Sequence, residues 1–211
     1  MIALSANGIR HVLLDADGVL QHRPGGWESA FEEWLGVRAN VFLEEMFAAE
    51  KPAIRGERDA VEVLGEVLDR YGVTASPDEV FESVWHRIEP VPASLDLVRR
   101  LRAAGFGVHL GTNQSLRRAA YMREELGYDD LFDVSCYSAE LGLAKPDPAY
   151  FRRALELIGA PPEQVLFVDD VEPNVDGARE VGMAGIHWHL RDGHDQLEKL
   201  LAEHGVVPAP A

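Results

Sequence analysis

The stretch 11-HVLLDADGVLQH-22 decides how this chain folds. Val12, Leu13 and Leu14 form an apolar run suited to a buried strand, yet Asp15 and Asp17 follow it directly. Burying a carboxylate is costly unless it is paired, so two of them at the end of a core strand need an explanation. In an open parallel sheet, ligands bind beyond the carboxyl ends of the strands. We therefore predict a strand over residues 9–15 that carries two acidic groups to a ligand-binding edge.

From residue 91 onward, short apolar runs alternate with helical patterns. We expect strands over 106–113, 133–139, 164–170 and 184–190, and helices over 94–105, 116–127, 147–159, 172–183 and 193–205. Strands that alternate with helices of this length imply right-handed crossovers and a parallel sheet. The predicted fold class is α/β, a Rossmann-like parallel sheet with helices on both faces.

Residues 27–89 break this rhythm, because four helical patterns follow one another without a convincing strand between them. We expect a small helical domain over residues 21–90, inserted after the first strand into a core made of residues 1–20 and 91–211. Pro24-Gly25-Gly26 lies at one joint and two prolines lie at the other, which is the chemistry of linkers. The end of the chain, from Gly205, is expected to fray.

Composition restricts the partners. The formal net charge of −16 argues against nucleic acid and against an anionic membrane surface. Cys136 is the only cysteine, and the chain shows neither a signal peptide pattern nor a long apolar segment. We expect a cytoplasmic protein that is a monomer or a homodimer.

Polar residues also stand at the carboxyl ends of two other predicted strands. Thr112 and Asn113 follow one apolar run, and Asp169 and Asp170 follow another. Any one of these pairs could simply form a turn through hydrogen bonds from side chain to backbone. Three such strand ends, with Asp15 and Asp17, would meet at one edge of the sheet, which favours a functional site.

Clustered carboxylates repel one another unless a positive charge neutralises them. Oxygen ligands of this kind suit Mg²⁺, which binds through a few carboxylates, water and substrate phosphate. His187 and His189 would share one strand face, but a zinc site is not favoured because no third ligand is evident. Lys145, directly before Pro146, is a candidate partner for a phosphate, although the ordinary alternative is a solvated loop lysine.

Four segments together carry a resemblance to a known family. They are "DADGVL" (15–20), "GTNQ" (111–114), "GLAKPDPAYF" (142–151) and "VDDVEPNVDGA" (168–178). In order and spacing they resemble the four motifs of the haloacid dehalogenase superfamily. The resemblance covers the whole chain, since the helical insert is similar to the cap of the type I members.

The resemblance implies roles for the acidic residues. Asp15 matches the nucleophile, and Asp17 matches the general acid/base whose backbone carbonyl also binds Mg²⁺. Asp170 matches the direct metal ligand, and Asp169 matches a residue in supporting contact with the metal. Because dehalogenases of this type usually lack an acid at the position of Asp17, the resemblance implies a phosphatase or a phosphotransferase.

The remaining motif residues also receive roles from the resemblance. Thr112, with the Asn113 amide, matches the phosphate-binding second motif, and Lys145 matches the cation that orients nucleophile and phosphate. Asn174 matches a residue that ties the site together by hydrogen bonds, although capping of a helix N-terminus explains it equally well.

Substrate choice is expected to depend on the helical insert. Most of its aromatic residues have the spacing of a bundle core, whereas Arg23 and Trp27 near the joint are better placed to contact substrate. The similarity to sugar-phosphate phosphatases and to the phosphatase domains of epoxide hydrolases implies a small phosphorylated metabolite, with a sugar phosphate favoured. A phosphomutase of the β-phosphoglucomutase type stays open, and so do, less favoured, a haloacid dehalogenase and a non-catalytic binding protein.

Overall fold

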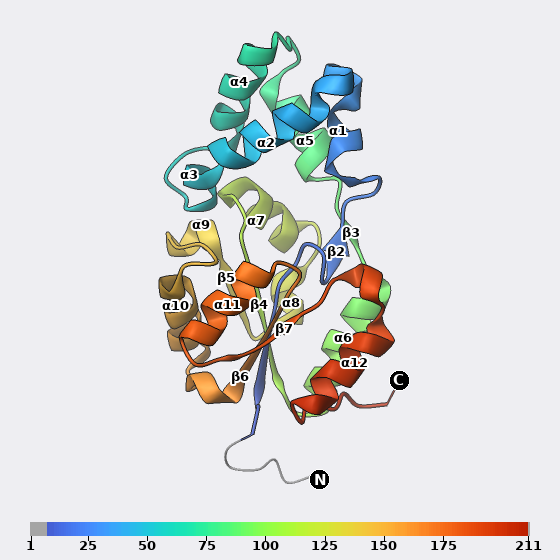
Figure 1. Cartoon of the computed structure of the whole chain (residues 1–211), viewed down its shortest axis with the longest axis vertical. Coiled ribbons are helices and arrows are strands. Elements are labelled where there is room, and N and C mark those ends of the chain that lie inside the picture. The colour runs from blue at the N-terminus through green and yellow to red at the C-terminus, as the bar shows by residue number, and fades with distance from the viewer. Residues whose placement is uncertain (1–7, 211) are drawn as a thin grey trace.

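The computed structural model describes residues 8–210, and its centre is a five-stranded parallel sheet (Figure 1). The strand order is β5-β4-β1-β6-β7. The bounds are β1 His11–Leu14, β4 Gly107–Thr112, β5 Val134–Tyr137, β6 Val165–Asp169 and β7 Ala184–His187. His11 of β1 lies opposite Gly107 of β4 and Val165 of β6, so β1 is the central strand. The predicted α/β fold class is confirmed.

Helices cover both faces of this sheet, which is why its strands are apolar almost throughout. The covering helices are α6 Pro92–Ala103, α7 Leu116–Glu124, α8 Tyr128–Leu131, α10 Pro148–Ile158, α11 Glu172–Glu180 and α12 His194–Glu203. Successive β1 side chains point to opposite faces. Val12 and Leu14 pack in the cluster that contains Leu97 of α6, and Leu13 packs with Tyr150 of α10 on the other face.

Short elements join these layers and were not predicted. They are α9 Ser138–Leu141 and the 3-10 turns η2 Pro162–Gln164 and η3 Leu190–Asp192. The last strand is also shorter than the expected 184–190, because it ends at His187 opposite Asp169, the last residue of β6, and a 3-10 turn begins at Leu190, whose N–H donates to the Gly18 carbonyl at 2.8 Å. His189 therefore lies beyond the strand.

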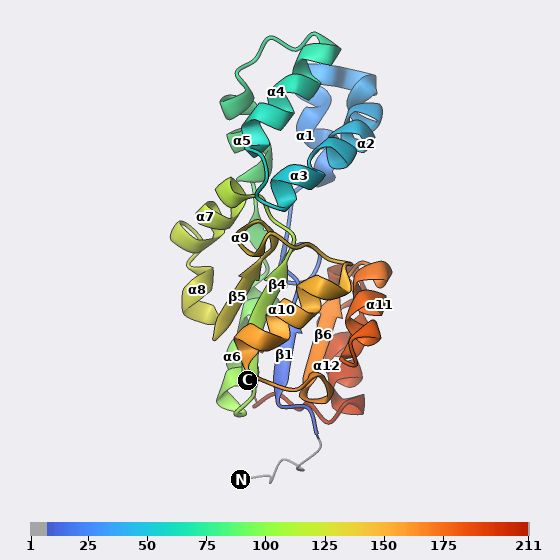
Figure 2. The same cartoon turned by 90° about the vertical axis from the view of Figure 1, so that its left-hand side faces the viewer.

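A helical insert occupies the space beyond the carboxyl ends of the strands (Figures 1 and 2). It consists of α1 Gly26–Leu35, η1 Gly36–Arg38, α2 Ala39–Ala49, α3 Lys51–Ile54, α4 Ala60–Tyr71 and α5 Pro77–Trp85. These helices pack around a core of their own, in which the rings of Phe31 and Phe42 are 4.7 Å apart. The expected division into residues 21–90 and the rest agrees with this separate core and stays a prediction about independent domains.

Two chain crossings connect the insert to the sheet. They pair as a short antiparallel ladder, β2 Gln21–His22 with β3 Glu89–Pro90, where only linkers were expected. A second contact lies on the opposite side, where the Ser138 hydroxyl donates to the Ile54 carbonyl at 2.7 Å. Arg117 of α7 adds ion pairs to Asp59 and Asp78 of the insert at 3.1 and 2.8 Å. The insert therefore contacts the rest of the fold on both sides of the sheet edge.

The expectation of a frayed C-terminal segment is wrong for residues 205–210. Val206 is fully buried in the main core, and the Ala209 N–H donates to the Arg100 carbonyl at 3.1 Å. Burial of the Val206 side chain in the main core, together with this hydrogen bond, offsets part of the conformational freedom that the segment loses. None of the helices in residues 8–210 combines the length and the apolarity that crossing a lipid bilayer would require.

Candidate active site

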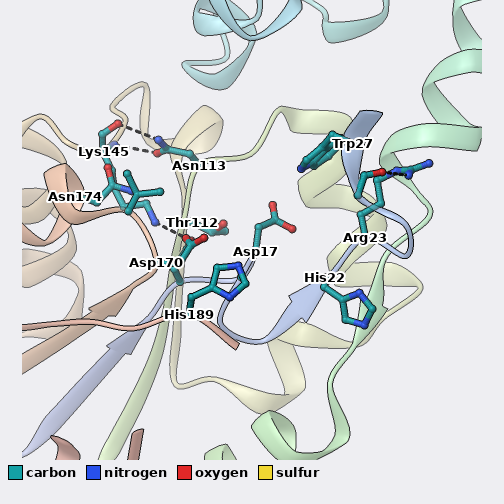
Figure 3. Close-up of a pocket in the computed structure, with 14 residues that line it drawn as sticks. Asp17, His22, Arg23, Trp27, Thr112, Asn113, Lys145, Asp170, Asn174 and His189 are labelled. Carbon is teal, nitrogen blue, oxygen red and sulfur yellow. Dashed lines mark hydrogen bonds and ion pairs between the residues drawn. The ribbon is translucent and has the colours of Figure 1, made fainter. Parts of the chain in front are cut away.

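The predicted site residues converge on one cavity at the carboxyl edge of the sheet. The cavity has a volume of about 550 Å³, and all of the predicted residues except Asp169 line it. Figure 3 shows Lys145, Asp170 and Thr112 on one side, Trp27 and Arg23 on the other, and Asp17 between them. The three strand ends thus form a single site with the joint of the insert.

Lys145 connects two buried carboxylates. Its Nζ donates to Asp15 Oδ1 at 2.7 Å and to Asp169 Oδ2 at 2.6 Å, so it is not a solvated loop lysine. Burial alone would lower the pKa of Lys145, but the charges of Asp15 and Asp169 outweigh burial and raise it. For Asp15 burial has the opposite effect and is the larger cause, because it raises the pKa of this carboxyl to about 8 although the charge of Lys145 acts to lower it. The site is short of positive charge even with this lysine present.

The two adjacent carboxylates at the end of β6 have different surroundings. Asp169 accepts from the Val171 N–H at 2.8 Å and from Asn174 Nδ2 at 3.0 and 3.1 Å, in addition to Lys145. None of the side chains that the structure describes donates to the Asp170 carboxylate, and burial, followed by the charge of Asp169, raises the pKa of Asp170 to about 6. Asp170 is therefore the carboxylate that remains available to a ligand, while Asp169 orients Lys145 and Asn174.

These residues fit a hard divalent cation. Carboxylate oxygens of Asp15, Asp169 and Asp170 all lie within 4.8 Å of one another. Oxygen donors of this kind are the ligands that Mg²⁺ prefers, and a cation beside Asp15 and Asp170 would favour their ionised forms against the burial that raises the pKa of each. His187 and His189 are used otherwise, since one pairs with the Asp170 carbonyl and the other accepts from the Arg191 N–H.

Gly18 allows the end of the first strand and the Asp170 carboxylate to lie this close together. Its φ is +77°, and a Cβ at this position would lie 2.3 Å from Asp170 Oδ2. Any other residue would be strained and would also displace the carboxylate. The glycine in "DADG" thus protects the geometry of Asp170, which is far away in the sequence.

Asp17 makes a set of contacts that the sequence analysis missed. Arg118 of α7 donates two hydrogen bonds to its carboxylate, at 2.7 and 2.8 Å, and Gln21 and Gln114 each donate one at 2.9 Å. Burial alone would raise the pKa of Asp17, but Arg118 and these hydrogen bonds outweigh burial and lower it. Nothing in the sequence distinguishes Arg118 from its neighbour Arg117, which instead binds the insert.

The second motif is attached to the third by a reciprocal pair of hydrogen bonds. Asn113 Nδ2 donates to the Lys145 carbonyl and Asn113 Oδ1 accepts from the Lys145 N–H, both at 2.9 Å. The Asn113 side chain is thereby committed to positioning Lys145. The Thr112 hydroxyl is buried at the cavity and accepts from Gln114 Nε2 at 3.1 Å. Phosphate binding by Thr112 and the Asn113 amide stays a prediction.

The two residues predicted to contact substrate from the joint both line the cavity, but they are held differently. Arg23 is buried, and its guanidinium donates to the carbonyls of Val84 and Gly26 at 3.1 and 2.6 Å. Trp27 is half-buried and packs edge-on against Phe47 with ring centroids 5.9 Å apart. Arg23 therefore fastens the joint to the insert, while the exposed part of Trp27 is free to meet a ligand.

Comparisons with known proteins agree with the motifs. Residues 9–182 match the family of haloacid dehalogenase-like hydrolases. The chain is 34% identical over 100 residues to the sesquiterpene phosphatase astK of Aspergillus oryzae, which covers 47% of this chain and 51% of that protein. It is 24% identical over 200 residues to a phosphorylated carbohydrates phosphatase of Thermotoga maritima, with 89% of each covered.

A solved structure supports the same fold. A HAD family enzyme of Bacteroides thetaiotaomicron, solved as a magnesium complex, superimposes with a TM-score of 0.76 at 21% identity, covering 90% of this chain and 98% of the other. Because the family match extends over most of the sequence and its motifs meet at one sheet edge, this chain belongs to the haloacid dehalogenase-like hydrolases.

Proposed function

We propose that this protein is a Mg²⁺-dependent phosphatase that hydrolyses a small phosphorylated metabolite through an aspartyl-phosphate on Asp15. One observation carries the proposal. Asp15 is buried with its carboxylate 2.7 Å from Lys145 Nζ, next to the Asp170 carboxylate, to which no described side chain donates, and the carboxylate of Asp17 lies at the same edge. A divalent metal ion would balance this excess of negative charge and would also attract a dianionic phosphate.

The proposed reaction has two steps. An oxygen of Asp15 attacks phosphorus, the bond from phosphorus to the leaving oxygen breaks, and Asp17 donates a proton to that oxygen. Water then attacks the same phosphorus while Asp17 accepts its proton, and the bond from phosphorus to Asp15 breaks to release inorganic phosphate. Lys145 holds Asp15 in place and offsets the charge that gathers on the phosphoryl oxygens.

Asp17 is poised as a base in this geometry. Its pair with Arg118 keeps the carboxylate ionised, as activation of water requires. To act as the acid in the first step, Asp17 must leave Arg118 and bind a proton. We therefore expect the side chain to exchange the guanidinium for the leaving oxygen when substrate is bound.

Mg²⁺ would be held by Asp15 and Asp170, with the Asp17 carbonyl as a further ligand and Asp169 in support. When bound, it supplies positive charge to the phosphoryl group and to the carboxylates. The donor set of the site and the magnesium complex of the similar Bacteroides enzyme support this assignment. Activity should consequently disappear in excess chelator and return when Mg²⁺ is added.

The similar proteins do not point to a single substrate for this chain. The sequence favours a sugar phosphate, but the similar phosphatases carry names for chemically different substrates, phosphorylated carbohydrates in one and sesquiterpenes in the other. A sugar phosphate therefore stays one prediction among phosphate monoesters. A cytoplasmic location and a monomeric or dimeric state also stay predictions.

Asp17 also bears on the alternatives. A halide leaves without a proton, so a dehalogenase has no use for a carboxylate held at this position by four hydrogen bonds. A phosphomutase would need a phosphorylated Asp15 that survives until its phosphate is returned, and a bisphosphate activator would then remove a kinetic lag. A binding protein would hydrolyse no ester at all.

The test compares Asp15→Asn with Asp17→Asn on an aryl phosphate, which has a good leaving group. We expect Asp15→Asn to have no turnover and no covalent adduct. Asp17→Asn should lose roughly 10²–10⁴-fold in turnover, the usual contribution of general acid–base catalysis, and should accumulate phosphorylated protein. Intact-protein mass spectrometry after a rapid acid quench would detect the added HPO₃, and peptide mapping would locate it.

The double variant Asp15→Asn/Asp17→Asn is the control and should carry no label. A label on a residue other than Asp15 would refute the assignment of the nucleophile. Equal loss of turnover in the two single variants with no trapped species would refute the division of roles.

A further inference from the structure

A second cavity adjoins the catalytic one on the side of the insert. Its volume is about 220 Å³, and it shares the lining residues Asp17, Trp27 and Asn113 with the catalytic cavity. An engineered cavity of about 150 Å³ with apolar walls is large enough to bind benzene. The second cavity therefore has room for an aromatic ring or a short alkyl chain next to the reacting groups.

The wall that the insert contributes is apolar except for the carboxyl group of Glu50. Its apolar residues are Trp27, Met46, Phe47, Ile54, Phe81 and Trp85, together with the small side chain of Ala60. These residues come from all five α-helices of the insert, so no single stretch of sequence reveals the surface. Phe81 and Trp85 stack with ring centroids 5.2 Å apart, which gives that part of the wall a rigid aromatic face.

Most polar atoms on the opposite wall are already paired within the protein. Arg118 binds the Asp17 carboxylate, and both side-chain polar atoms of Asn113 bind Lys145. The lining polar groups without a hydrogen-bond partner among the described residues include the Ser115 hydroxyl, Arg118 Nε and, on the wall of the insert, the Glu50 carboxyl, whose pKa burial raises to about 7. A sugar has several hydroxyl groups, and this cavity offers few groups to bind them.

The position of the cavity relative to the reaction decides what enters it. In the proposed mechanism, Lys145 and Thr112 lie on the phosphoryl side, and the leaving oxygen must face Asp17 to receive its proton. The organic group attached to that oxygen then lies beside Asp17, at the boundary that the two cavities share.

We propose that the leaving group is apolar, so that the substrate is the phosphate monoester of an alkyl or aromatic alcohol whose carbon chain occupies this second cavity. This inference rests on the proposed phosphatase function and names the substrate class of the same site. Burial of each methylene should raise kcat/KM by up to about fourfold until the cavity is full.

The experiment measures kcat/KM for ethyl, butyl, hexyl and octyl phosphate, benzyl phosphate and glucose 6-phosphate, all with Mg²⁺. We expect a rise from ethyl to hexyl phosphate of at least about tenfold, and hexyl phosphate should exceed the sugar phosphate by a similar factor. A flat series, or a sugar phosphate hydrolysed as well as hexyl phosphate, overturns the apolar site and leaves the phosphatase function standing.

Two variants test the location. Ile54→Gln and Phe47→Gln place a polar amide in the cavity wall and should reduce the ratio of hexyl to ethyl phosphate several-fold. Val41→Gln is the matched control, because Val41 also lies on α2 but is 61% exposed and does not line the cavity. If the ratio of hexyl to ethyl phosphate is the same in all three variants and in the unmodified protein, the alkyl chain of the substrate binds elsewhere and the proposal is overturned.

If the protein hydrolyses none of these esters, the proposed function fails. Measurements of ligand binding then still test the apolar cavity. Calorimetry with methylphosphonate and hexylphosphonate, each with Mg²⁺, reports on the cavity without turnover. Tighter binding of hexylphosphonate that is lost in Ile54→Gln supports the apolar site, and equal affinities overturn it.

Discussion

The edge of the sheet and the core of the insert are both buried, but they bury opposite kinds of groups. At the edge, Asp15, Lys145 and Asp169 form a buried charged cluster. In the insert, Phe31 and Phe42 pack ring against ring with no polar partner needed. Burying charge costs free energy, whereas burying rings supplies it. The comparison teaches that reactivity and stability have separate locations in this molecule, and substitutions should separate them.

The largest expected effect is at the edge, where Asp170→Asn should lower kcat/KM with Mg²⁺ by at least about 10²–10³-fold, as for other preorganised charged groups. The same change should stabilise the protein in chelator at pH 7.5. The pKa of Asp170 is raised to about 6 in the folded state, so its contribution to stability is present below about pH 4 and is lost as pH rises through 6. An asparagine never ionises and avoids that loss.

Activity assays and thermal unfolding in chelator at pH 4 and 7.5 check this prediction. The stabilisation should shrink at pH 4, where the carboxyl is protonated in the folded state and about half protonated in the unfolded state. Asp176→Asn is the control, since Asp176 lies on α11 in an exposed pair with Arg179 and should change neither quantity much. An Asp170→Asn protein with near-normal Mg²⁺-dependent turnover would remove Asp170 from the metal site.

The next effect is in the insert and should have the opposite character. Phe42→Ala leaves a cavity in a core where Phe42 is fully buried, so we expect the free energy of unfolding to fall by about 3–5 kcal/mol. Phe42 lines neither cavity of the site, so the substitution should leave the transition state almost unaffected. We therefore expect kcat/KM of the folded fraction to change less than about threefold. Urea denaturation and kinetics at low temperature measure the two quantities.

Val41→Ala, at an exposed position next to it, is the matched control and should have little effect on stability. If Phe42→Ala instead lowered kcat/KM as strongly as it lowered stability, the insert core and the site would be coupled. The separation drawn between the two regions would then fail.

The smallest effect concerns protons that compete with the metal. At pH 5 a carboxyl with a pKa of about 6 is mostly protonated, so apparent Mg²⁺ affinity should be at least about tenfold weaker than at pH 7. The raised pKa of Asp15 acts in the same direction. Calorimetric titration with Mg²⁺ at the two pH values measures this, and pH-independent affinity would show that these carboxyls do not ligate the metal.

The sequence alone determined much of the sheet edge. Short-range patterns carry this information, because an apolar run followed by acidic residues specifies both a strand and the chemistry at its end. Proline and glycine residues likewise predicted the ends of helices from local sequence. The helix α10 begins at Pro148 after Asp147, whose side chain accepts from the Ala149 N–H, and ends before Gly159. Asp15, Lys145 and Asp170 lie in segments of this kind, whose resemblance to the family's motifs implies their roles, and they meet in one cavity.

Some local expectations failed where distant contacts outweighed local composition. The joints of the insert pair as β2 and β3 although their prolines and glycines suggested free linkers. The final segment is held by the burial of Val206 against the main core, which a glycine- and proline-containing tail does not predict.

Only the tertiary structure decided what surrounds Asp17. Arg118 reaches it across 101 positions in the sequence, and neither the arginine nor its spacing reveals that contact. The apolar cavity beside Asp17 is likewise assembled from residues of separate helices that have ordinary bundle-core spacing. A side chain that fills a core and a side chain that lines a cavity obey the same periodicity. Which of the two it becomes depends on how closely the helices and the sheet edge pack against each other.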